Sequence, residues 1–400
     1  MSVSPAAARE FVIRLLLLAD NSTSHSHIEA SSPKRNDWVA DAEVDWEQVW
    51  EVAASERVAP LLYRATRGVD SIPEWWRERC RAAYHETGIL NTLRLQELKT
   101  LLSDFKTAGL DVILLKGAAL IELVYGNPAL RPMVDLDFLV RRQDVDVALA
   151  VFDRREYRKA GNEIARGSTL AYENEALLQK EASYGWQVEL HWHLFDSPYY
   201  QRRLSESEWW RTAVSMTVEG EDALCLSPEW TMIHLCGHLI FHHQGRGLLW
   251  WNDLAELVRM KKGDIHWDYV MTQVRAARMI LPLQNIIPVL ATTWRAPIPE
   301  EVTNRLQSIA PEQEEVELFQ AMTGDRFSPG HRLLVDVKGL GSPREKARFL
   351  MHNVFPSTTY MDSRYSIRHP AARPFYYVYR WVLGLSGMVR DSLRSGRDDR

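Results

Sequence analysis

The chain has 400 residues, a mass of 46.2 kDa, and 46% hydrophobic and 25% charged residues, a composition typical of a globular protein with a sizeable core. Lysine and arginine number 48 against 53 aspartates and glutamates, a formal net charge of −5. This balance disfavours binding of nucleic acid through overall charge, and no DNA partner is expected. The three cysteines are too few for a disulfide framework and form no CxxC pair, which favours a reducing, cytoplasmic location. They are Cys80, Cys225 and Cys236.

The N-terminal apolar run covers residues 11–19. Arg14 interrupts this run, which is shorter than the ~20 residues of a membrane span. Glu10 before it and polar residues after it do not match a secretory signal. An amphipathic helix is therefore predicted here, and the polar residues 21–36 predict a loop.

Residues 45–106 predict helices, because apolar side chains recur at helical spacing over 46–53 and a long helix is expected from about 73 to 102. Gly109 ends this stretch. The middle third predicts, in chain order, a buried strand at 110–115, a short helix at 118–125, a strand at 133–140, a helix at 141–157 and an alternating strand at 186–193.

Residues 158–186 mix strand and turn signals. From Ser227 the chain is predicted to be helical, with Ser227 as N-cap and Pro228 in the first turn. The predicted divisions are an N-terminal helical region (1–106), a small α/β core (107–225), a C-terminal helical domain (226–390) and a disordered charged tail (391–400).

Asp135 and Asp137 lie in a strand pattern, whose period of two places both side chains on one face. Two carboxylates ~6–7 Å apart repel each other unless a cation lies between them. Mg²⁺ is suited to this role because it prefers oxygen ligands. The alternative for so short a motif is that both carboxylates are solvated on an exposed strand face.

Two neighbouring patterns favour the metal interpretation. Upstream, a buried strand ends at Lys116-Gly117 and a helix follows, and backbone N–H groups at such a turn suit phosphate. Downstream, Glu189 lies on an alternating strand and shares its face with His191 and His193. A third carboxylate would complete an acidic triad able to hold two Mg²⁺ ions, or one Mg²⁺ with a general base.

These residues resemble the uncharacterised nucleotidyltransferase family of the DNA-polymerase-beta-like superfamily. The motifs that carry the resemblance are Leu114-Leu-Lys-Gly-Ala-Ala-Leu120, Tyr125-Gly126, Arg131-Pro-Met-Val-Asp-Leu-Asp-Phe-Leu-Val140 and Val188-Glu-Leu-His-Trp192. Weaker similarity at 46–63, 252–256 and 355–365 extends the resemblance over about residues 40–385.

The resemblance implies an α+β fold with a small mixed-sheet nucleotidyltransferase core, flanked by N-terminal helices and a C-terminal helical bundle. It implies a nucleoside triphosphate, with ATP favoured, and Mg²⁺, with two ions expected. By position, Gly117 and Ala118 match the turn that holds the triphosphate, Asp135 and Asp137 the metal-binding pair, and Glu189 the third acidic residue. The turn lacks the second Gly or the Ser usual in the superfamily, and Glu189 stands where Asp is more common.

The mechanism this implies is in-line attack of an acceptor oxygen on the α-phosphorus, with pyrophosphate leaving. Glu189 would ligate a metal or take the acceptor proton. Lys116 and Arg131 are candidate phosphate contacts, with a solvated strand end and a structural ion pair as their respective alternatives. His191 would orient Glu189 or contact the nucleotide, whereas Trp192 is predicted to be core and His193 a strand-end residue.

Four histidines, His234, His238, His242 and His243, follow helical spacing. A packed helix face beside the active site is the preferred interpretation, with zinc binding as the alternative. His238 and Asp253 are candidates for the acceptor pocket, and Asp253 is equally a candidate helix cap.

The aromatic residues 375–383 are expected to close the C-terminal bundle. The less favoured alternative is a basic amphipathic helix, with Arg380, Arg390, Arg394 and Arg397, that lies on an anionic membrane surface. The resulting hypothesis is a Mg²⁺-dependent nucleotidyltransferase that acts on a small-molecule, sugar-like or peptide acceptor. The alternatives are a catalytically weak nucleotide-binding or partner-binding module, and an AMP transferase that modifies proteins. Three mutually repelling carboxylates argue against the first alternative, because a protein without catalysis has no need to keep them.

Overall fold

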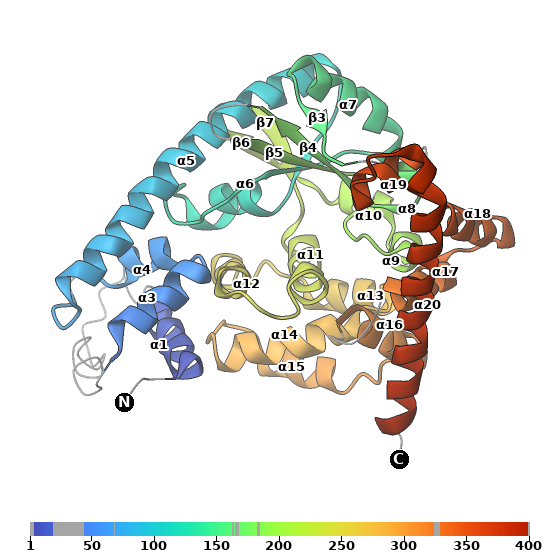
Figure 1. The fold of residues 1–400 in the computed structure, drawn as a ribbon. Helices are drawn as coiled ribbons and strands as arrows, with labels where there is room; N and C mark the ends of the chain where they lie inside the picture. The colour runs from blue at the N-terminus through green and yellow to red at the C-terminus, as the bar shows by residue number, and fades with distance from the viewer. Residues whose placement is uncertain are drawn as a thin grey trace.

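A mixed seven-stranded sheet lies at the centre of the chain, between a long N-terminal helix and a layer of C-terminal helices (Figure 1). The computed structural model describes residues 4–18, 44–67, 69–161, 164, 168–181, 185–323 and 329–398. The predicted α+β class is confirmed. The loop expected at 21–36 lies outside the described residues.

The sheet order is β3-β4-β5-β2-β1-β7-β6. Its strands are β1 (Ile113–Leu114), β2 (Leu136–Leu139), β3 (Arg158–Lys159), β4 (Glu175–Lys180), β5 (Trp186–His191), β6 (Val214–Val218) and β7 (Glu221–Cys225). The pairs β2–β5 and β1–β7 are parallel, and the remaining neighbours are antiparallel. The three strands predicted from the sequence are therefore adjacent at the centre of the sheet.

The outer strands were missed or left ambiguous by the sequence patterns. β3 and β4 come from the segment with mixed signals, and the β6–β7 hairpin was not predicted. Glu219 and Gly220 form its two-residue turn, both with positive φ (50° and 85°), as a type I′ turn requires. A Glu-Gly pair between two alternating runs was the available signal.

The two faces of the sheet have different neighbours. Leu136 and Phe138 of β2 point to a core shared with α5 and α7, where the ring of Phe138 lies 5.5 Å from Phe105 and 5.6 Å from Phe152. The alternate residues, including Asp137, point to the opposite face, toward the C-terminal helices. The alternation of side chains along β2 therefore places apolar residues in the core on one face of the sheet and polar residues on the other.

The N-terminal helices follow the predicted pattern. They are α1 (Pro5–Leu17), α3 (Trp46–Ser55), α4 (Ala59–Ala65) and α5 (Glu74–Thr107). Helix α5 ends at Ala108, and Gly109 follows with φ 71°, as expected for a helix-terminating glycine.

Short helices connect the strands of the middle third. They are α6 (Lys116–Leu120), the π-helical turn η2 (Ile121–Tyr125), η3 (Arg142–Asp144), α7 (Val145–Arg154), α8 (Ser168–Tyr172), α9 (Pro198–Arg203) and α10 (Glu206–Arg211). Lys116 begins α6 rather than preceding it, and its φ of 44° turns the chain sharply out of β1.

The C-terminal third is helical, as predicted. Its helices are α11 (Pro228–Phe241), α12 (Leu248–Met260), α13 (Trp267–Ala277), α14 (Ile280–Thr292), α15 (Glu300–Gln307), α16 (Gln313–Thr323), α17 (Pro329–Gly339), α18 (Pro343–Val354), α19 (Thr358–Tyr365), η4 (Pro370–Ala372) and α20 (Arg373–Asp398). The Ser227 hydroxyl caps α11 by accepting from the Trp230 amide, as predicted. Helix α20 continues to Asp398, into the segment 391–400 for which disorder was predicted.

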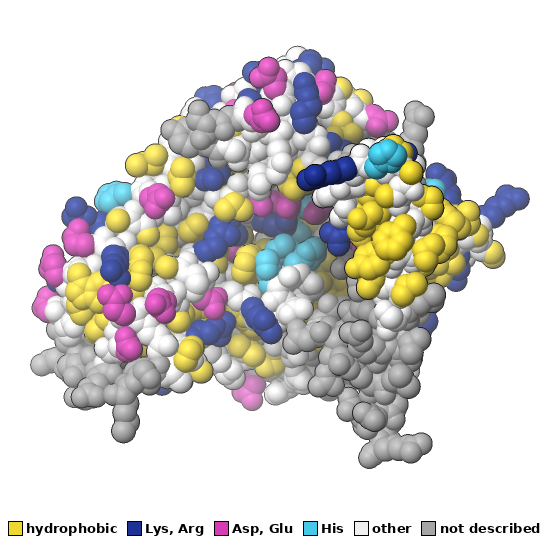
Figure 2. All heavy atoms as spheres, in the orientation of Figure 1, with side chains coloured by type: hydrophobic (Ala, Val, Ile, Leu, Met, Phe, Trp, Pro, Cys, Tyr) yellow, Lys and Arg dark blue, Asp and Glu magenta, His cyan; other side chains and the backbone are white. Residues whose placement is uncertain are grey.

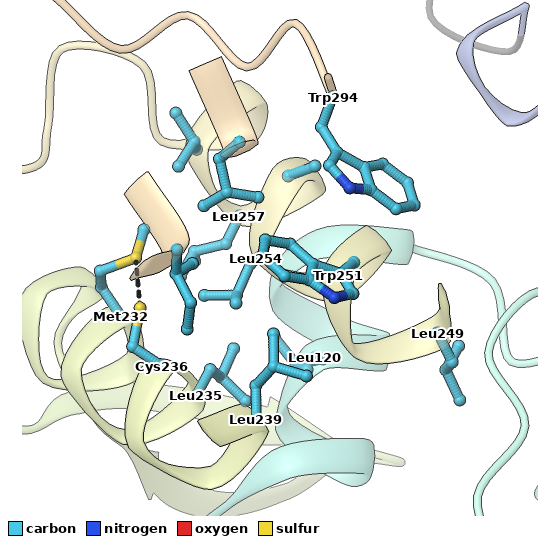
Figure 3. Close-up of a cluster of buried hydrophobic side chains, with 14 of the residues drawn as sticks. Leu120, Met232, Leu235, Cys236, Leu239, Leu249, Trp251, Leu254, Leu257 and Trp294 are labelled. Atoms are coloured by element: carbon cyan, nitrogen blue, oxygen red, sulfur yellow. Dashed lines mark hydrogen bonds between the residues drawn. The ribbon is translucent and has the colours of Figure 1, made fainter. Parts of the chain in front are cut away.

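Helices α11 and α12 carry the apolar contacts that hold the C-terminal region against the sheet domain. Leu235 and Leu239 of α11 face Leu254 of α12, and Leu120 from α6 joins the same cluster (Figure 3). The Cys236 thiol points to the Met232 sulfur at 3.7 Å. This packing fixes α11 and α12 below the polar face of the sheet. No helix in the described part of the chain is both long and apolar enough to cross a membrane.

We predict that Gly237→Ala lowers the melting temperature by several degrees. An added Cβ would lie 2.2 Å from the Phe195 ring, and such overpacking costs ~1–3 kcal/mol. Gly384→Ala is the matched control, because its Cβ meets nothing within 4 Å and should be neutral or slightly stabilising. Calorimetry on both variants checks this. Equal stabilisation by the two changes would contradict the packing of α11.

Candidate functional site

A cleft of about 450 Å³ lies between the polar face of the sheet and helices α11 and α12. Its charged lining residues are Arg57, Lys116, Arg131, Asp135, Glu175 and Glu189. Its aromatic and imidazole lining residues are His191, His234, His238, His242, His243 and Trp250. Figure 2 shows acidic, basic and histidine side chains gathered in a hollow in the middle of the face that it displays. Titratable side chains therefore make up most of the cleft lining, and the remainder is largely apolar.

Asp137 and Glu189 are direct neighbours on the parallel strands β2 and β5. Lys116 lies over both, with its Nζ 2.7 Å from Asp137 Oδ1 and 2.9 Å from Glu189 Oε2. Asp137 is only 1% exposed, so the ammonium separates it from the cleft. Although burial opposes the charge, the two carboxylates raise the pKa of Lys116, which keeps it protonated.

His191 completes the charge balance from the end of β5. Its Nε2 lies 3.1 Å from Asp137 Oδ1 and 3.4 Å from Glu189 Oε2, and its Nδ1 lies 3.0 Å from Glu175 Oε2. Burial opposes protonation of His191, but the Glu175 charge and the bond to Asp137 raise its pKa well above the usual value. Asn174 donates to Glu175 Oε2 at 3.1 Å and holds that carboxylate in place.

Asp135 is the carboxylate that faces the cleft without a partner. It lies one residue before β2, and among the described side chains none makes a hydrogen bond or ion pair with it. Burial and the charges of Asp137 and Glu189 raise the pKa of Asp135 to about 6. Asp135 therefore points to the same side of the sheet as Asp137, as the alternation predicted, although it lies outside the strand.

The repulsion between the carboxylates is balanced by cations of the chain itself, which the sequence analysis did not consider. Lys116 and His191 neutralise the buried pair, so the protein does not need a metal to tolerate these charges. The three carboxylates therefore no longer count against a non-catalytic module, because the chain itself supplies the compensating cations.

Donor atoms of Asp137, Glu189 and His191 lie within 4.8 Å of one another and could hold a metal ion. The expected set was Asp135, Asp137 and Glu189, so His191 takes the place of Asp135 in this cluster. A protonated His191 donates hydrogen bonds and cannot ligate a metal. The oxygen donors that fit Mg²⁺ are thus the carboxylates, once the Lys116 ammonium moves away from them.

Arg131 forms the structural ion pair that was the alternative to a phosphate contact. Its guanidinium binds Asp253 through Nη2–Oδ2 at 2.8 Å and Nε–Oδ1 at 3.1 Å, with both side chains buried. Tyr125 donates to Asp253 Oδ1 at 2.6 Å, and Asn91 binds the carbonyl of Arg131 at 2.8 Å. Asp253 is 0% exposed and lies within α12, whose N-cap is Gly247. Its expected roles as a helix cap and as an acceptor-pocket residue are therefore both wrong.

Gly117 and Ala118 differ in their access to the cleft. Gly117 lines it, and a Cβ there would lie 2.7 Å from Arg131 Nη1 and 2.9 Å from Met133 Cβ. Glycine is thus required for close packing of Arg131 over α6. Ala118 is 1% exposed and belongs to the core shared with α5 and α7, so its side chain is not in a nucleotide-binding position.

Two arginines near Asp135 were not identified from the sequence. Arg57 lines the cleft, donates to the Pro132 carbonyl at 3.2 Å, and has no ion pair in the described part of the chain. Arg94 of α5 likewise has no carboxylate partner among the described residues. Burial lowers the pKa of both, and Asp135 partly offsets this. The positive φ of Arg57 (59°) marks a turn that no periodic pattern predicts.

The four histidines form the cleft wall opposite the carboxylates. The His238 and His243 Nε2 atoms are 3.0 Å apart, and the His243 ring stacks on Trp250 at 3.5 Å. Burial lowers the pKa of His234 and His238 well below the usual value and that of His243 to about 4, so these rings are neutral at pH 7. Of the four, His234 and His238 lie on α11, whereas His242 is the C-cap residue of that helix and His243 follows it.

Two further predictions concern the end of β5. Trp192 is buried, as predicted, and its Nε1 donates to the Glu173 carbonyl at 2.8 Å. His193 lies just beyond the strand, accepts from the Phe195 amide, and is absent from the cleft wall. Burial lowers the pKa of His193 to about 4, consistent with a structural position.

We predict that Asp135→Asn raises the melting temperature of the metal-free protein by roughly 1–3 °C at pH 8, because it removes a charge that two carboxylates repel. The raised pKa means that the ionised form destabilises the fold above about pH 6. The gain should therefore fade as the pH falls from 6 toward 4. Thermal scans in EDTA at pH 4.5 and 8 measure this. A loss of stability at pH 8 would contradict the electrostatics described.

We predict that Asp253→Asn costs about 3–5 kcal/mol of stability, because it leaves the Arg131 guanidinium buried without its charge partner. The double variant Arg131→Met/Asp253→Leu should recover most of that loss, since it removes both charges. Denaturant unfolding of the two variants checks the pair. A single variant as stable as the unsubstituted protein would show that the ion pair is not structural.

The chain was compared with known proteins by sequence and by structure. A crystal structure of an antigenic nucleotidyltransferase-like protein from Paracoccidioides brasiliensis matches at 15% identity with a TM-score of 0.35, over 53% of this chain and 96% of that one. No curated protein matches the sequence. The model of the uncharacterised nucleotidyltransferase family matches residues 42–295, well short of the residue 385 to which the similarity was expected to extend. The match covers more than half of the chain, which therefore belongs to the uncharacterised nucleotidyltransferase family.

Proposed function

We propose that the protein transfers a nucleoside monophosphate from a nucleoside triphosphate to a small acceptor in the cleft, in a Mg²⁺-dependent reaction. The observation that carries the proposal is the pairing of Asp137 with Glu189 on adjacent strands, with Asp135 beside them at the cleft wall. Three carboxylates so placed match the donor chemistry of a divalent-metal site. Family membership supports the same class of reaction.

Asp135, Asp137 and Glu189 would hold Mg²⁺ once the Lys116 ammonium leaves the buried pair. The ions would supply neutralisation of the phosphate charge and a lower pKa for the acceptor hydroxyl. His191 would keep Glu189 in position through its hydrogen bonds to that residue and to Asp137. Burial raises the pKa of Glu189, but the His191 hydrogen bond lowers it, as does the Lys116 charge before a metal binds. Glu189 is therefore assigned the role of a ligand rather than of a base.

Lys116, Arg57 and Arg94 would bind the triphosphate. When metal cations take the place of the Lys116 ammonium, that ammonium loses its two carboxylate partners. It then needs a new anion. Arg57 and Arg94 form no ion pair among the described residues. A partly buried guanidinium without an ion-pair partner lowers the stability of the fold. Arg131 is neutralised by Asp253 and supports the site from below instead.

In the proposed reaction the acceptor oxygen forms a bond to the α-phosphorus while the bond to the pyrophosphate oxygen breaks. The acceptor proton passes to solvent or to a carboxylate of the site, and pyrophosphate leaves with its electron pair. Lys116 and Arg57 lower the cost of the charge that develops on the leaving oxygens. ATP is the proposed donor, and a small-molecule, sugar-like or peptide acceptor would lie against the neutral histidine wall that includes His238.

A second candidate function is nucleotide binding with little or no catalysis. One observation favours it: the Lys116 ammonium contacts both Asp137 and Glu189, so a cation of the chain itself balances these carboxylates. Such a module would bind a triphosphate through Arg57 and Arg94 and leave the internal pair intact. Modification of a protein by AMP transfer uses the same site and differs only in the acceptor.

The proposal predicts that one triphosphate raises the melting temperature by several degrees only when Mg²⁺ is present. The double variant Asp135→Asn/Asp137→Asn should lose this shift, since it lacks the metal donors. Label from the α-phosphate, but not the γ-phosphate, should then appear in product when cell extract supplies the acceptor. Triphosphate binding that does not depend on Mg²⁺ and survives in the double variant would favour the non-catalytic module. Absence of any triphosphate binding would overturn both functions.

Arg57→Gln is predicted to weaken triphosphate binding by ~10-fold or more, with stability nearly unchanged, because Arg57 has no ion pair to lose. Arg79→Gln is the matched control, since Arg79 is exposed on α5 and pairs with Glu47 away from the cleft. Calorimetric titration with MgATP compares the two. Equal affinities would remove Arg57 from the phosphate site.

A further inference from the structure

Helix α20 leaves one of its two faces uncovered. Its inner face contacts α17, α19 and the end of α18, where Trp381 donates to the Val354 carbonyl at 2.6 Å and Tyr377 to the Pro356 carbonyl at 2.5 Å. Arg373 binds Asp362 of α19 at 2.6 Å on the same side. The residues between these contacts point away from the protein.

The outer face of α20 is apolar. Phe375, Val378, Tyr379, Val382 and Leu383 are exposed by 68%, 52%, 45%, 58% and 50%. Their spacing places them on one stripe of the helix. They are five of the fourteen large apolar side chains exposed in the described chain. A patch this concentrated marks an interaction surface. The expected closure of the bundle by residues 375–383 is thus only half right.

The charge around this patch is positive. Residues 363–386 contain four arginines and no aspartate or glutamate, within a chain whose net charge is −5. Arg364 and Arg368 are exposed beside the stripe. The two acidic residues of the preceding helices, Glu345 and Asp362, are paired with Arg202 and Arg373. Figure 2 shows the apolar patch over α19 and the first part of α20, with basic side chains at its rim.

The positive charge beside the outer face of α20 favours some binding partners over others. A second copy of the chain would bring the same arginines to the interface, and like charges would repel. A nucleic-acid backbone would satisfy the arginines, but it offers nothing to bury Val378, Val382 and Leu383. An anionic membrane surface satisfies both, because its headgroups carry negative charge and the underlying acyl chains accept apolar side chains.

We propose that the outer face of α20 docks the protein on the surface of a membrane that contains anionic lipid. The helix lies in the plane of the interface, with Phe375, Val378 and Val382 inserted between the lipids. Arg364 and Arg368, both exposed, lie at the level of the headgroups, whereas Arg373 is paired with Asp362. Among the described residues, no helix is long and apolar enough to cross the bilayer. The docking is peripheral and reversible, and it is independent of the nucleotidyl-transfer proposal.

The test is flotation of the full-length protein with vesicles of neutral phosphatidylcholine, and with vesicles that contain 30% phosphatidylglycerol. The expected result is binding to the anionic vesicles alone, decreasing with added NaCl because the headgroup attraction is screened. Val378→Asp/Val382→Asp should lower the bound fraction by ~10-fold or more. Ile89→Asp is the matched control, since Ile89 is 65% exposed but lies on α5. This variant should bind the vesicles as the unsubstituted protein does.

Three outcomes would overturn the proposal. The first is no binding to anionic vesicles. The second is equal binding of the Val378→Asp/Val382→Asp variant, provided that its circular dichroism and melting temperature match those of the unsubstituted protein. The third is a dimer in sedimentation velocity that the same variant dissociates, which would assign the face to a second copy. Arg364→Gln/Arg368→Gln supplies a further check that leaves the apolar stripe intact, and it should weaken binding to anionic vesicles only.

Discussion

The contact of the Lys116 ammonium with Asp137 and Glu189 is the constraint on which the site depends. Two carboxylates on adjacent strands in the interior would not ionise together without a compensating charge, and the chain supplies one from the first residue of α6. The positive φ of Lys116 and the absence of a side chain at Gly117 allow this geometry. His191 adds a second positive charge, and Glu175 holds that ring from behind.

The ion pair of Arg131 and Asp253 links the two halves of the cleft. It joins the segment before β2 to α12, and Tyr125 and Asn252 complete its hydrogen bonds. Together with the apolar contacts of α11 and α12, it holds the histidine wall opposite the carboxylates. The histidine wall of the cleft thus comes from helices that follow the strands of the sheet in the sequence.

Local patterns predicted the parts of the fold that depend on local rules. The alternation around Asp137 and Glu189 correctly placed both on one sheet face, since strand period is a property of neighbouring residues. The order of the strands and the partners of Arg131 and Lys116 depend on contacts far apart in the chain, so the sequence left them open. Arg57 was missed because it lies in a turn between helices, where no periodicity marks it. The β6–β7 hairpin carried a usable turn signal that was overlooked.

The exposed stripe of α20 illustrates the same limit. Its composition predicted a bundle helix, and only the packing of α17 and α19 on the opposite side shows that five apolar residues remain uncovered. A helix pattern specifies which residues share a face, but not whether a partner within the chain covers that face.

The internal ammonium of Lys116 also bears on the order in which ligands bind. In the proposed reaction, Mg²⁺ on Asp137 and Glu189 would displace the Lys116 ammonium from both of its carboxylate partners. A triphosphate that arrives with its own Mg²⁺ would offer that ammonium a new anion in the same event. The proposed function therefore implies that the metal–nucleotide complex binds as one unit, and that free Mg²⁺ alone binds weakly.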